Sequence, residues 1–238
     1  MRIIAMIPAR YASSRFPGKL MKPLGNKSVI RHTYDNTVAT RLFDEVWVVT
    51  DSDIIYNEIT GSGGNARMSA APHESGSDRI AEAIAGMDID VVVNVQGDEP
   101  FIDTQSLQQL IALFEDDTVE VGSIMRPIES EEQVKNPNCV KVVTDLHMNS
   151  LLFSRSVIPF LRNKSAATQY YEHVGIYAFK KDALLQFTQW PITPLEDAEK
   201  IECLRFREHG IPLRMTISNF RGVGIDTPED LKRAIELL

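Results

Sequence analysis

The sequence predicts an α/β protein with an open, mixed but mostly parallel sheet, helices on both faces and a smaller α+β insertion. Apolar runs with the length of buried strands alternate with helical patterns over residues 1–125, and the alternation returns after residue 194. Between them, residues 127–180 contain shorter, alternating strands. A chain of 238 residues can bury the core of one large domain, so we predict a single domain over residues 1–238.

The first half of the chain reads as alternating strands and helices. Pro8 is expected to end the first strand, because proline cannot donate to a ladder. The helix after the polar loop 73–79 is expected to take Ser77 or Asp78 as its cap. The expected strands are residues 3–7, 45–50, 67–69, 90–95 and 119–125, and the expected helices are residues 29–38, 52–60, 78–86 and 104–115.

The second half of the chain begins with the insertion. Its expected strands are residues 140–143, 151–154 and 173–179. One continuous helix over 194–208, a strand over 213–217, a polar loop over 222–230 and a final helix to Leu238 then complete the chain.

Charge is distributed unevenly along the chain. The formal net charge is −8, which argues against a general nucleic-acid or membrane-surface binder. Residues 1–34 nevertheless hold seven Lys and Arg residues and no Asp or Glu. Cys139 and Cys203 lack the spacing of a metal site and do not suggest a disulfide framework. With no signal-peptide core or membrane span visible, we expect a cytoplasmic location.

A basic loop follows the first strand. It carries Arg10, Arg15 and Lys19, with Ser13 and Gly18 among them. Ligands of open α/β sheets bind outside the carboxyl ends of the strands, so this loop indicates phosphate or carboxylate recognition. The alternative is a solvated basic loop with no ligand.

Two carboxylates follow later strands. Asp98 comes after the buried strand 90–95, behind Gly97, and Asp226 lies in a glycine-flanked loop before a helix. Mg²⁺ on a nucleoside triphosphate takes one or two carboxylates together with phosphate oxygens. From the residues alone, Asp98 could equally be a turn-forming residue and Asp226 a cap at the approach to the helix.

A glycine pattern at residues 61–66 formally matches the dinucleotide-binding fingerprint. That fingerprint must follow a strand and open a helix, whereas this one follows a helix. Glycines that end a helix explain it better, which weakens a nicotinamide-dependent oxidoreductase as an alternative.

Seven segments in register carry a resemblance to a known family. They are residues 7–19, 73–79 (His73-x-Ser75-Gly76-Ser77-Asp78-Arg79), 94–100 (Asn94-Val95-Gln96-Gly97-Asp98-Glu99-Pro100), 136–143, 153–159, 173–177 and 223–231. The chain resembles the 3-deoxy-manno-octulosonate cytidylyltransferases, the CMP-Kdo synthetases of bacterial lipopolysaccharide synthesis, over its full length.

The resemblance implies a nucleotide-diphospho-sugar transferase (Rossmann-like) fold and a homodimer formed largely through residues 127–180. It also implies Mg²⁺-dependent transfer of CMP from CTP to the anomeric hydroxyl of Kdo, with release of diphosphate. By position, Lys19, Arg15, Asp98 and Asp226 would be catalytic, with Asp98 and Asp226 binding Mg²⁺. Pro8, Ala9, Arg10, Ser75, Gly76, Arg79 and Gln96 would bind CTP, and Arg155, His173, Tyr177 and Glu202 would line the sugar-acid pocket.

Two positions depart from the family pattern. Leu20 stands where the family usually has proline, so we expect a less constrained loop, and Cys203 stands where the family usually has a glutamine facing the sugar. Glu99 agrees with the Kdo enzymes and disfavours 8-amino-Kdo as the substrate.

Alternatives remain for the individual residues and for the function. His173 could be a satisfied strand histidine, Tyr177 a core or dimer residue, and Arg155 the partner of a carboxylate. The alternative functions are a cytidylyltransferase for 8-amino-Kdo or a sialic acid, and a non-catalytic nucleotide-binding module.

Overall fold

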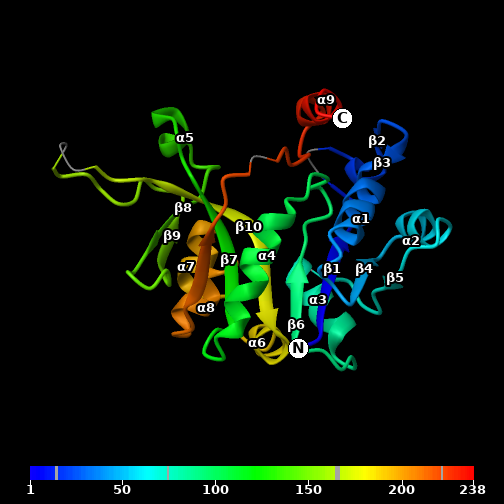
Figure 1. Cartoon of the computed structure of the whole chain (residues 1–238), viewed down its shortest axis with the longest axis horizontal. Helices are drawn as coiled ribbons and strands as arrows, with labels where there is room; N and C mark the ends of the chain where they lie inside the picture. Colours follow the sequence, from blue (N-terminus) through cyan, green and yellow to red (C-terminus); the bar gives the residue numbers. More distant parts are fainter. Residues whose placement is uncertain (14–15, 74, 164–166, 221) are drawn as a thin grey trace. The chain divides into compact units, whose positions relative to one another are not determined.

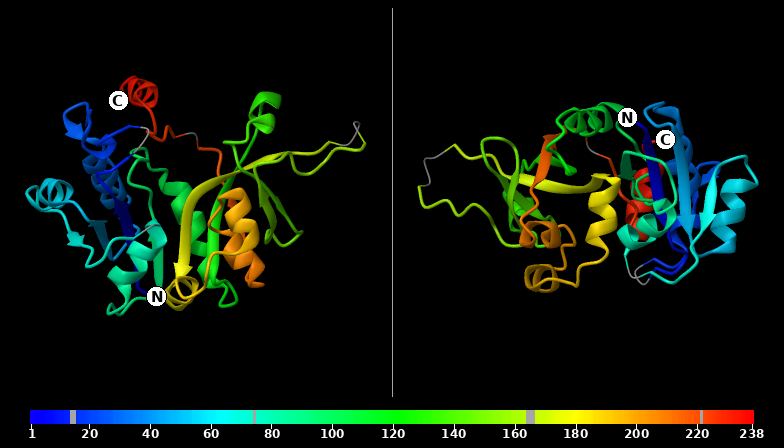
Figure 2. Two further views of the ribbon diagram at one scale, coloured as in Figure 1. Left: turned by 180° about the vertical axis from the view of Figure 1, so that it is seen from behind. Right: turned by 90° about the horizontal axis from the view of Figure 1, so that it is seen from below.

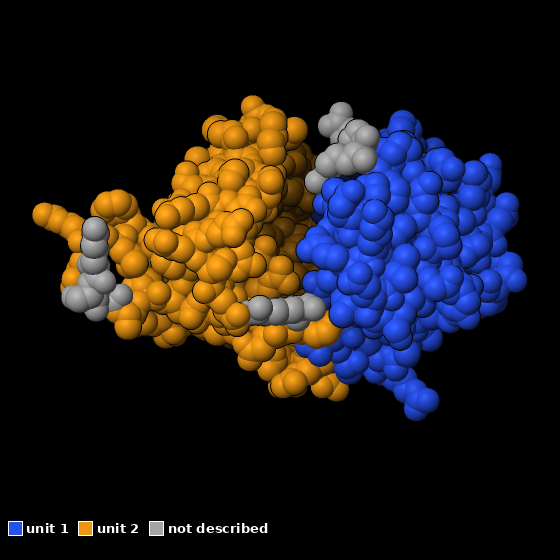
Figure 3. Space-filling view, turned by 90° about the horizontal axis from the view of Figure 1, so that it is seen from above, with its two compact units in different colours: residues 1–104, 221–238 blue, residues 105–220 orange. Residues whose placement is uncertain are grey.

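Strand β1 and its neighbours form the centre of the first of two units. The computed structural model describes residues 1–13, 16–73, 75–163, 167–220 and 222–238, and Arg15 lies outside them. Unit 1 comprises Met1–Thr104 with Arg221–Leu238, and unit 2 comprises Gln105–Phe220, as coloured in Figure 3. Figure 1 labels the elements of both units.

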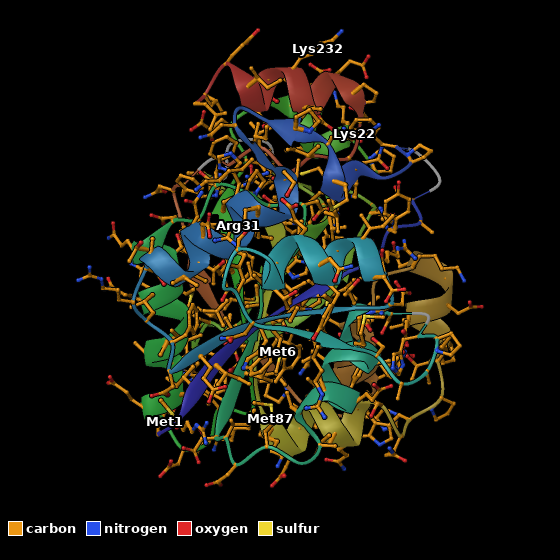
Figure 4. The ribbon with its side chains drawn as sticks, turned by 90° about the vertical axis from the view of Figure 1, so that its right-hand side faces the viewer. Met1, Met6, Lys22, Arg31, Met87 and Lys232 are labelled. Atoms are coloured by element: carbon orange, nitrogen blue, oxygen red, sulfur yellow. The ribbon has the colours of Figure 1, made fainter. Side chains whose placement is uncertain are left out.

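Unit 1 contains a parallel sheet in the order β6-β1-β4-β5. Its strands are β1 (Ile3–Ala9), β4 (Glu45–Thr50), β5 (Ala66–Met68) and β6 (Val91–Asn94), with a small hairpin of β2 (Pro23–Leu24) and β3 (Lys27–Ser28). Its helices are η1 (Lys19–Met21), α1 (Val29–Ala39), α2 (Asp53–Thr60), α3 (Gly76–Ile84) and α9 (Pro228–Ile235). Met6, labelled in Figure 4, is 1% exposed in the core of this sheet.

The strand order of unit 1 contains a reversal between β1 and β6. From β1 the chain moves outward to β4 and then to β5, and it returns to the other side of β1 to form β6. Because such crossovers are right-handed, α1 and α2 cover one face of the sheet and α3 covers the other. In open α/β sheets a ligand site is expected at such a switch point, at the carboxyl ends of the two strands.

Unit 2 contains a mixed sheet in the order β11-β7-β10-β8-β9, in which β11 and β7 are parallel and the other neighbours are antiparallel. Its strands are β7 (Val121–Pro127), β8 (Lys141–Thr144), β9 (Ser150–Ser154), β10 (Tyr171–Lys180) and β11 (Leu213–Ile217), and Figure 2 shows β10 as a long yellow arrow. Its helices are α4 (Thr104–Ala112), η2 (Leu113–Glu115), α5 (Glu131–Lys135), α6 (Lys181–Phe187), α7 (Pro194–Glu199) and α8 (Leu204–Glu208).

The fold class and the order of most elements agree with the sequence prediction. The glycines at 61–64 do end a helix: the N–H of Gly64 donates to the Ile59 carbonyl, and Gly63 has a φ of +77°. Both cysteines are free thiols and buried. Among the helices of the described residues, none combines the length and apolar character of a membrane span.

The expected end of the first strand at Pro8 is wrong, because β1 continues to Ala9 in register with β4. The Met6 carbonyl accepts from the N–H of Val95 on the β6 side. The backbone N–H and C=O groups of every second residue in a strand point toward the same neighbouring strand. The missing N–H of Pro8 therefore faces the β6 side, where the ladder has already ended at Met6 and Asn94.

Three further expectations about helices are corrected. Helix α3 takes Ser75 as its N-cap, not Ser77 or Asp78, since the Ser75 hydroxyl accepts from the N–H of Asp78. Two short helices, α5 and α6, were not predicted. The continuous helix over 194–208 is wrong, because Lys200 adopts a left-handed φ of 52° and separates α7 from α8.

The break between α7 and α8 brings a buried ion pair together. Arg205 donates from Nε and Nη2 to the two carboxylate oxygens of Glu196 at 2.7 and 2.6 Å. In one continuous helix, residues nine positions apart would lie about 13.5 Å apart along the axis. The pair can form only because the chain turns at Lys200.

Candidate active site

A cavity of about 270 Å³ lies in unit 1 at the switch point of its sheet. It is lined from the end of β1 by Pro8, Ala9 and Arg10, and from the turn after β6 by Gln96, Gly97 and Asp98. Further lining residues are Ser13, Lys19, Leu20, His73, Ser75, Gly76, Arg79 and Asp226. Every described residue that the sequence suggested for the nucleotide or the metal is among them.

Lys19, Asp98 and Asp226 converge at this cavity. The Lys19 ammonium is paired with Oδ2 of Asp98 and lies 2.8 Å from Oδ1 of Asp226. The two carboxylates are 128 residues apart in sequence (226 minus 98), yet both reach one cation. The expected meeting of a basic loop with two distant carboxylates is confirmed.

The Asp98 turn is held in place by close backbone packing. A Cβ at Gly97 would lie 3.1 Å from the Pro8 carbonyl oxygen and 3.2 Å from a methyl of Ile30, so a side chain there would force a shift. The Thr33 hydroxyl on α1 donates to the Gly97 carbonyl at 2.9 Å. Gly97 therefore permits the close approach that was expected, and Asp98 is carried to the end of β1.

Asp226 reaches the same place through the segment before α9. The N–H of Ile225 donates to the Asp98 carbonyl at 2.9 Å, which ties the two carboxylate-bearing segments together. Helix α9 begins with a capping box between Thr227 and Asp230, with Pro228 in its first turn. The cap is Thr227, so the Asp226 carboxylate is left to pair with Lys19.

Lys19 opens a 3₁₀ turn that follows a glycine. Gly18 has a φ of +66°, a backbone conformation that residues other than glycine rarely adopt. The Tyr11 ring lies 3.4 Å from the position that a Cβ would occupy. Leu20, at a position where the resemblance led us to expect proline, is 5% exposed. Its side chain packs the turn against the core, and a less constrained loop stays a prediction.

The charge balance of this cluster fixes the protonation of Lys19. Burial alone would lower the pKa of Lys19, but the negative charges of Asp98 and Asp226 and their hydrogen bonds outweigh it and raise the pKa. The side chain therefore carries its positive charge at neutral pH.

Helix α3 supplies another wall of the cavity. Ser75 caps the helix and Gly76 opens it, and a Cβ at Gly76 would lie 3.1 Å from the Pro8 ring. Arg79 is 3% exposed and donates to Asp51 at 2.8 Å and to the Ser69 hydroxyl at 2.7 Å. Asp51, which the sequence analysis did not single out, thus holds a cavity-lining arginine.

Two of the expected sugar-pocket residues, His173 and Tyr177, meet in unit 2. Their rings lie 5.2 Å apart, although four residues of a regular strand span about 13 Å. An irregularity in the pairing of β10 with β7, between Val174 and Tyr177, shortens this distance.

The surroundings of His173 keep it neutral. Burial lowers its pKa from 6.5 to about 4. The Ser123 hydroxyl lies 3.1 Å from Nε2 of His173 and donates to the Ile176 carbonyl at 2.9 Å. A hydroxyl has one proton to donate, so it accepts from the N–H at Nε2 of His173.

Tyr177 lies against Cys203, at a position where the resemblance led us to expect glutamine. Burial raises its pKa well above the ordinary value, and the Cys203 thiol and the Glu202 charge act in the same direction. Burial likewise raises the pKa of the Cys203 thiol. Tyr177, Glu202 and Cys203 therefore form one group with His173, and both Tyr177 and Cys203 are uncharged.

Arg155 makes a different set of contacts. Its guanidinium donates to the backbone carbonyls of Pro137 at 3.0 Å, Glu199 at 2.7 Å and Lys200 at 3.4 Å. It braces the turn between α7 and α8, and its N–H donates to the Glu199 carboxylate. Among the described residues, the backbone N–H of Arg155 contacts a carboxylate, whereas its guanidinium contacts backbone carbonyls.

Comparison with known proteins decides the family. Residues 4–217 match the model of the cytidylyltransferase family. The chain belongs to this family. A 3-deoxy-manno-octulosonate cytidylyltransferase of Flavobacterium johnsoniae is 54% identical over 100% of this chain and 99% of its own length. Another of Christiangramia forsetii is 53% identical over 100% of this chain and 97% of its own length.

Solved structures agree on the fold of this cytidylyltransferase. A CMP:2-keto-3-deoxy-manno-octonic acid synthetase complexed with CTP has a TM-score of 0.94 and 36% identity, over 100% of this chain and 98% of that one. A 4-diphosphocytidyl-2C-methyl-D-erythritol synthase from Anaerococcus prevotii, at 16% identity and a TM-score of 0.63 over 99% and 98%, shares the fold alone. The α/β nucleotidyltransferase fold expected from the sequence is confirmed.

Proposed function

We propose that this cytidylyltransferase transfers CMP from CTP to the anomeric hydroxyl of Kdo and releases diphosphate. The observation that carries the proposal is the convergence of Lys19, Asp98 and Asp226 at the cavity of unit 1. The relatives named above, which match over nearly their whole length, are 3-deoxy-manno-octulosonate cytidylyltransferases, and one solved relative was complexed with CTP.

The cavity supplies the contacts that a nucleoside triphosphate requires. Arg10 and Lys19 would neutralise the phosphates, together with Arg15, which lies outside the described residues. The cytidine would be surrounded by Pro8, Ala9, Ser75, Gly76, Arg79 and Gln96. These residues would hold the α-phosphate of CTP toward the Asp98 turn. Positive charge here would reduce the repulsion between an anionic triphosphate and an anionic sugar acid.

The donor set fits a hard divalent cation. Asp98 and Asp226 each present a carboxylate oxygen to one shared cationic group, and Mg²⁺ prefers such oxygens together with phosphate oxygens. These two residues would hold Mg²⁺, which when bound supplies charge stabilisation at the phosphoryl group and helps to ionise the attacking hydroxyl. Lys19 would then leave the carboxylates and contact the phosphates.

Unit 2 would supply the sugar-acid contacts. His173, Tyr177 and Glu202 present neutral donors and acceptors and one carboxylate, which suit the hydroxyl groups of a sugar. Arg155 would recognise the sugar carboxylate only after exchanging some of its backbone partners. Cys203 beside Tyr177 would leave fewer hydrogen bonds to the sugar than the family's glutamine.

A homodimer formed through residues 127–180 is also part of the proposal. Apolar side chains are exposed in this segment: Phe160 is 84% exposed, Leu151 55% and Val157 40%. The start of β9 lies against β11, through a bridge between Asn149 and Arg214 and a hydrogen bond from the Leu213 N–H to the Ser150 hydroxyl. Beyond Ser150, β9 pairs only with β8 among the described strands, so this remaining part of its edge would be the part that pairs with a second copy. Sedimentation of the wild type against a Phe160→Asp variant tests this, and an unchanged monomer in both would contradict it. The cytoplasmic location stays a prediction.

The substrate is tested by diphosphate release. The protein is incubated with CTP, Mg²⁺ and one acid at a time: Kdo, 8-amino-Kdo or a sialic acid. We expect diphosphate with Kdo, and release with a sialic acid but not with Kdo would contradict the assignment.

Asp98→Ala should abolish nearly all turnover while the circular dichroism spectrum stays native, and an unchanged rate would contradict the metal role of Asp98.

A further inference from the structure

A carboxylate on α3, at Glu82, gathers three donors from the segment between β5 and α3. Its Oε1 accepts from the N–H of Ala70 at 2.7 Å, and its Oε2 accepts from the N–H of Ala71 at 3.2 Å. Nε2 of His73 lies 2.6 Å from the same Oε2. The sequence analysis did not assign Glu82 to the site, and Glu82 does not line the cavity.

Few other described interactions fix the conformation of segment 70–73. It belongs to no helix or strand, and Ala70, Ala71 and Pro72 are all exposed, so they contribute no core packing. Pro72 has no N–H to donate. Hydrogen bonds to Glu82 are therefore the main constraint visible on this segment, whose preceding residue, Ser69, is held by Arg79 from the same face of α3.

The segment ends at the wall of the cavity. His73 lines the cavity and is followed closely by Ser75 and Gly76, which line it as well. His73 is 15% exposed and Glu82 28%, so their contact is partly shielded from water. Burial would raise the pKa of Glu82, but its bonds to Ala70, His73 and Ala71 outweigh it and lower the pKa. The carboxylate is ionised at neutral pH, so Nε2 of His73 carries a proton.

We infer that Glu82 is a positioning residue for CTP binding: through Ala70, Ala71 and His73 it fixes the wall that the nucleotide contacts. This inference rests on the proposed placement of CTP in the cavity of unit 1. Glu82 touches neither the Lys19 cluster nor any reacting group, so its loss weakens binding of the ground state and of the transition state alike. Such a change raises KM for CTP and leaves kcat nearly unchanged.

The test measures KM for CTP and kcat in four single variants of the full chain. Glu82→Ala should raise KM about tenfold, which corresponds to about 1.4 kcal/mol, because it removes the three contacts that hold the segment. Glu82→Gln keeps one acceptor oxygen and should recover part of the loss. Glu58→Ala is the matched control: Glu58 also lies half-buried on a helix of unit 1, accepts from the Ser28 hydroxyl at 2.6 Å, and should leave KM unchanged.

Arg10→Ala reports on the cavity itself. If Arg10→Ala raises KM for CTP and Glu82→Ala does not, the role of Glu82 is overturned while the cavity assignment stands. If neither variant changes KM, the placement of CTP in this cavity is wrong and the inference fails with it. A fall in kcat at constant KM in Glu82→Ala would also overturn the inference.

A double-mutant cycle and a spectroscopic readout separate positioning from general destabilisation. His73→Ala and Glu82→Ala should be non-additive in their effects on KM, because they remove the same contact. In the wild type, the ¹⁵N spectrum of His73 should show the proton at Nε2, and Glu82→Gln should shift that signal. Additive effects on KM together with an unchanged His73 signal would overturn the inference even if Glu82→Ala folds poorly.

Discussion

At the scale of single residues, the cavity of unit 1 balances one ammonium against two carboxylates. Lys19 is shared by Asp98 and Asp226, and its raised pKa shows how strongly they hold its proton. A divalent cation on the same oxygens would compete with this ammonium. Under the proposed function, binding of the metal would release Lys19 from the carboxylates, and Lys19 would then contact the triphosphate.

Lys19→Met tests this exchange in the absence of nucleotide. The variant removes the ammonium that the two carboxylates share, so we expect Mn²⁺ to bind the nucleotide-free protein at least about tenfold more tightly than it binds the wild type, which corresponds to about 1.4 kcal/mol. Turnover should fall, because the phosphates lose a cation. Mn²⁺ titration followed by electron paramagnetic resonance measures the affinity, and equal affinity in both proteins would refute the competition.

His173 makes the stability of the protein depend on pH. Its pKa is about 4 in the folded protein against 6.5 when unfolded, because burial disfavours its charged form. The unfolded chain therefore binds a proton that the folded chain does not, and stability should fall as the pH decreases from 6.5 toward 4. We expect a loss of about 2 kcal/mol, less than the full shift would give because the side chain is partly exposed.

Denaturant unfolding at several pH values measures this loss. His173→Gln should flatten the dependence between pH 6.5 and pH 4, whereas the control His147→Gln, at an exposed position, should keep it. Identical slopes in the wild type and in His173→Gln would show that His173 is not the group responsible.

At the scale of elements, α7 and α8 depend on the pair between Glu196 and Arg205. Both side chains are about one-tenth exposed, and the Arg205 guanidinium also lies 4.2 Å from the Phe187 ring centre. Removal of one partner leaves a buried charge without compensation. The contact between the two short helices therefore depends on an ion pair that could not form if residues 194–208 were one continuous helix.

Arg205→Met should destabilise the protein by about 3 kcal/mol, measured as the free energy of unfolding in urea. The double variant Arg205→Met with Glu196→Leu should recover much of that loss, because no unpaired charge remains. If the loss of unfolding free energy in the double variant equals the sum of the losses in the two single variants, the packing of α7 on α8, and not the ion pair, stabilises this region.

At the scale of the whole molecule, the sequence predicted the parts of the site that lie in the loops after strands. Lys19, Asp98 and Asp226 could be placed because the carboxyl ends of parallel strands meet at one edge and the switch point lies between β1 and β6. Each lies beside a glycine or a cap with a recognisable pattern: Gly18, Gly97 and Thr227.

Other features could not be predicted from local patterns. Glu82 and Asp51 act through side-chain bonds to cavity-lining residues, and nothing in their own neighbourhood distinguishes them from surface carboxylates. The break at Lys200 depends on the pairing of Arg205 with Glu196, which local helix propensity does not contain. The irregularity in β10 that brings His173 to Tyr177 is likewise a property of strand pairing.

The proposed function requires that a metal ion and the phosphates of CTP meet at the Lys19, Asp98 and Asp226 cluster. It is tested most directly by Mn²⁺ binding in the presence of CTP, followed by electron paramagnetic resonance in the wild type, Asp98→Asn and Asp226→Asn. We predict a signal from protein-bound Mn²⁺ with CTP in the wild type and its loss in both variants, each still natively folded. A bound signal of equal strength in all three proteins would contradict the account.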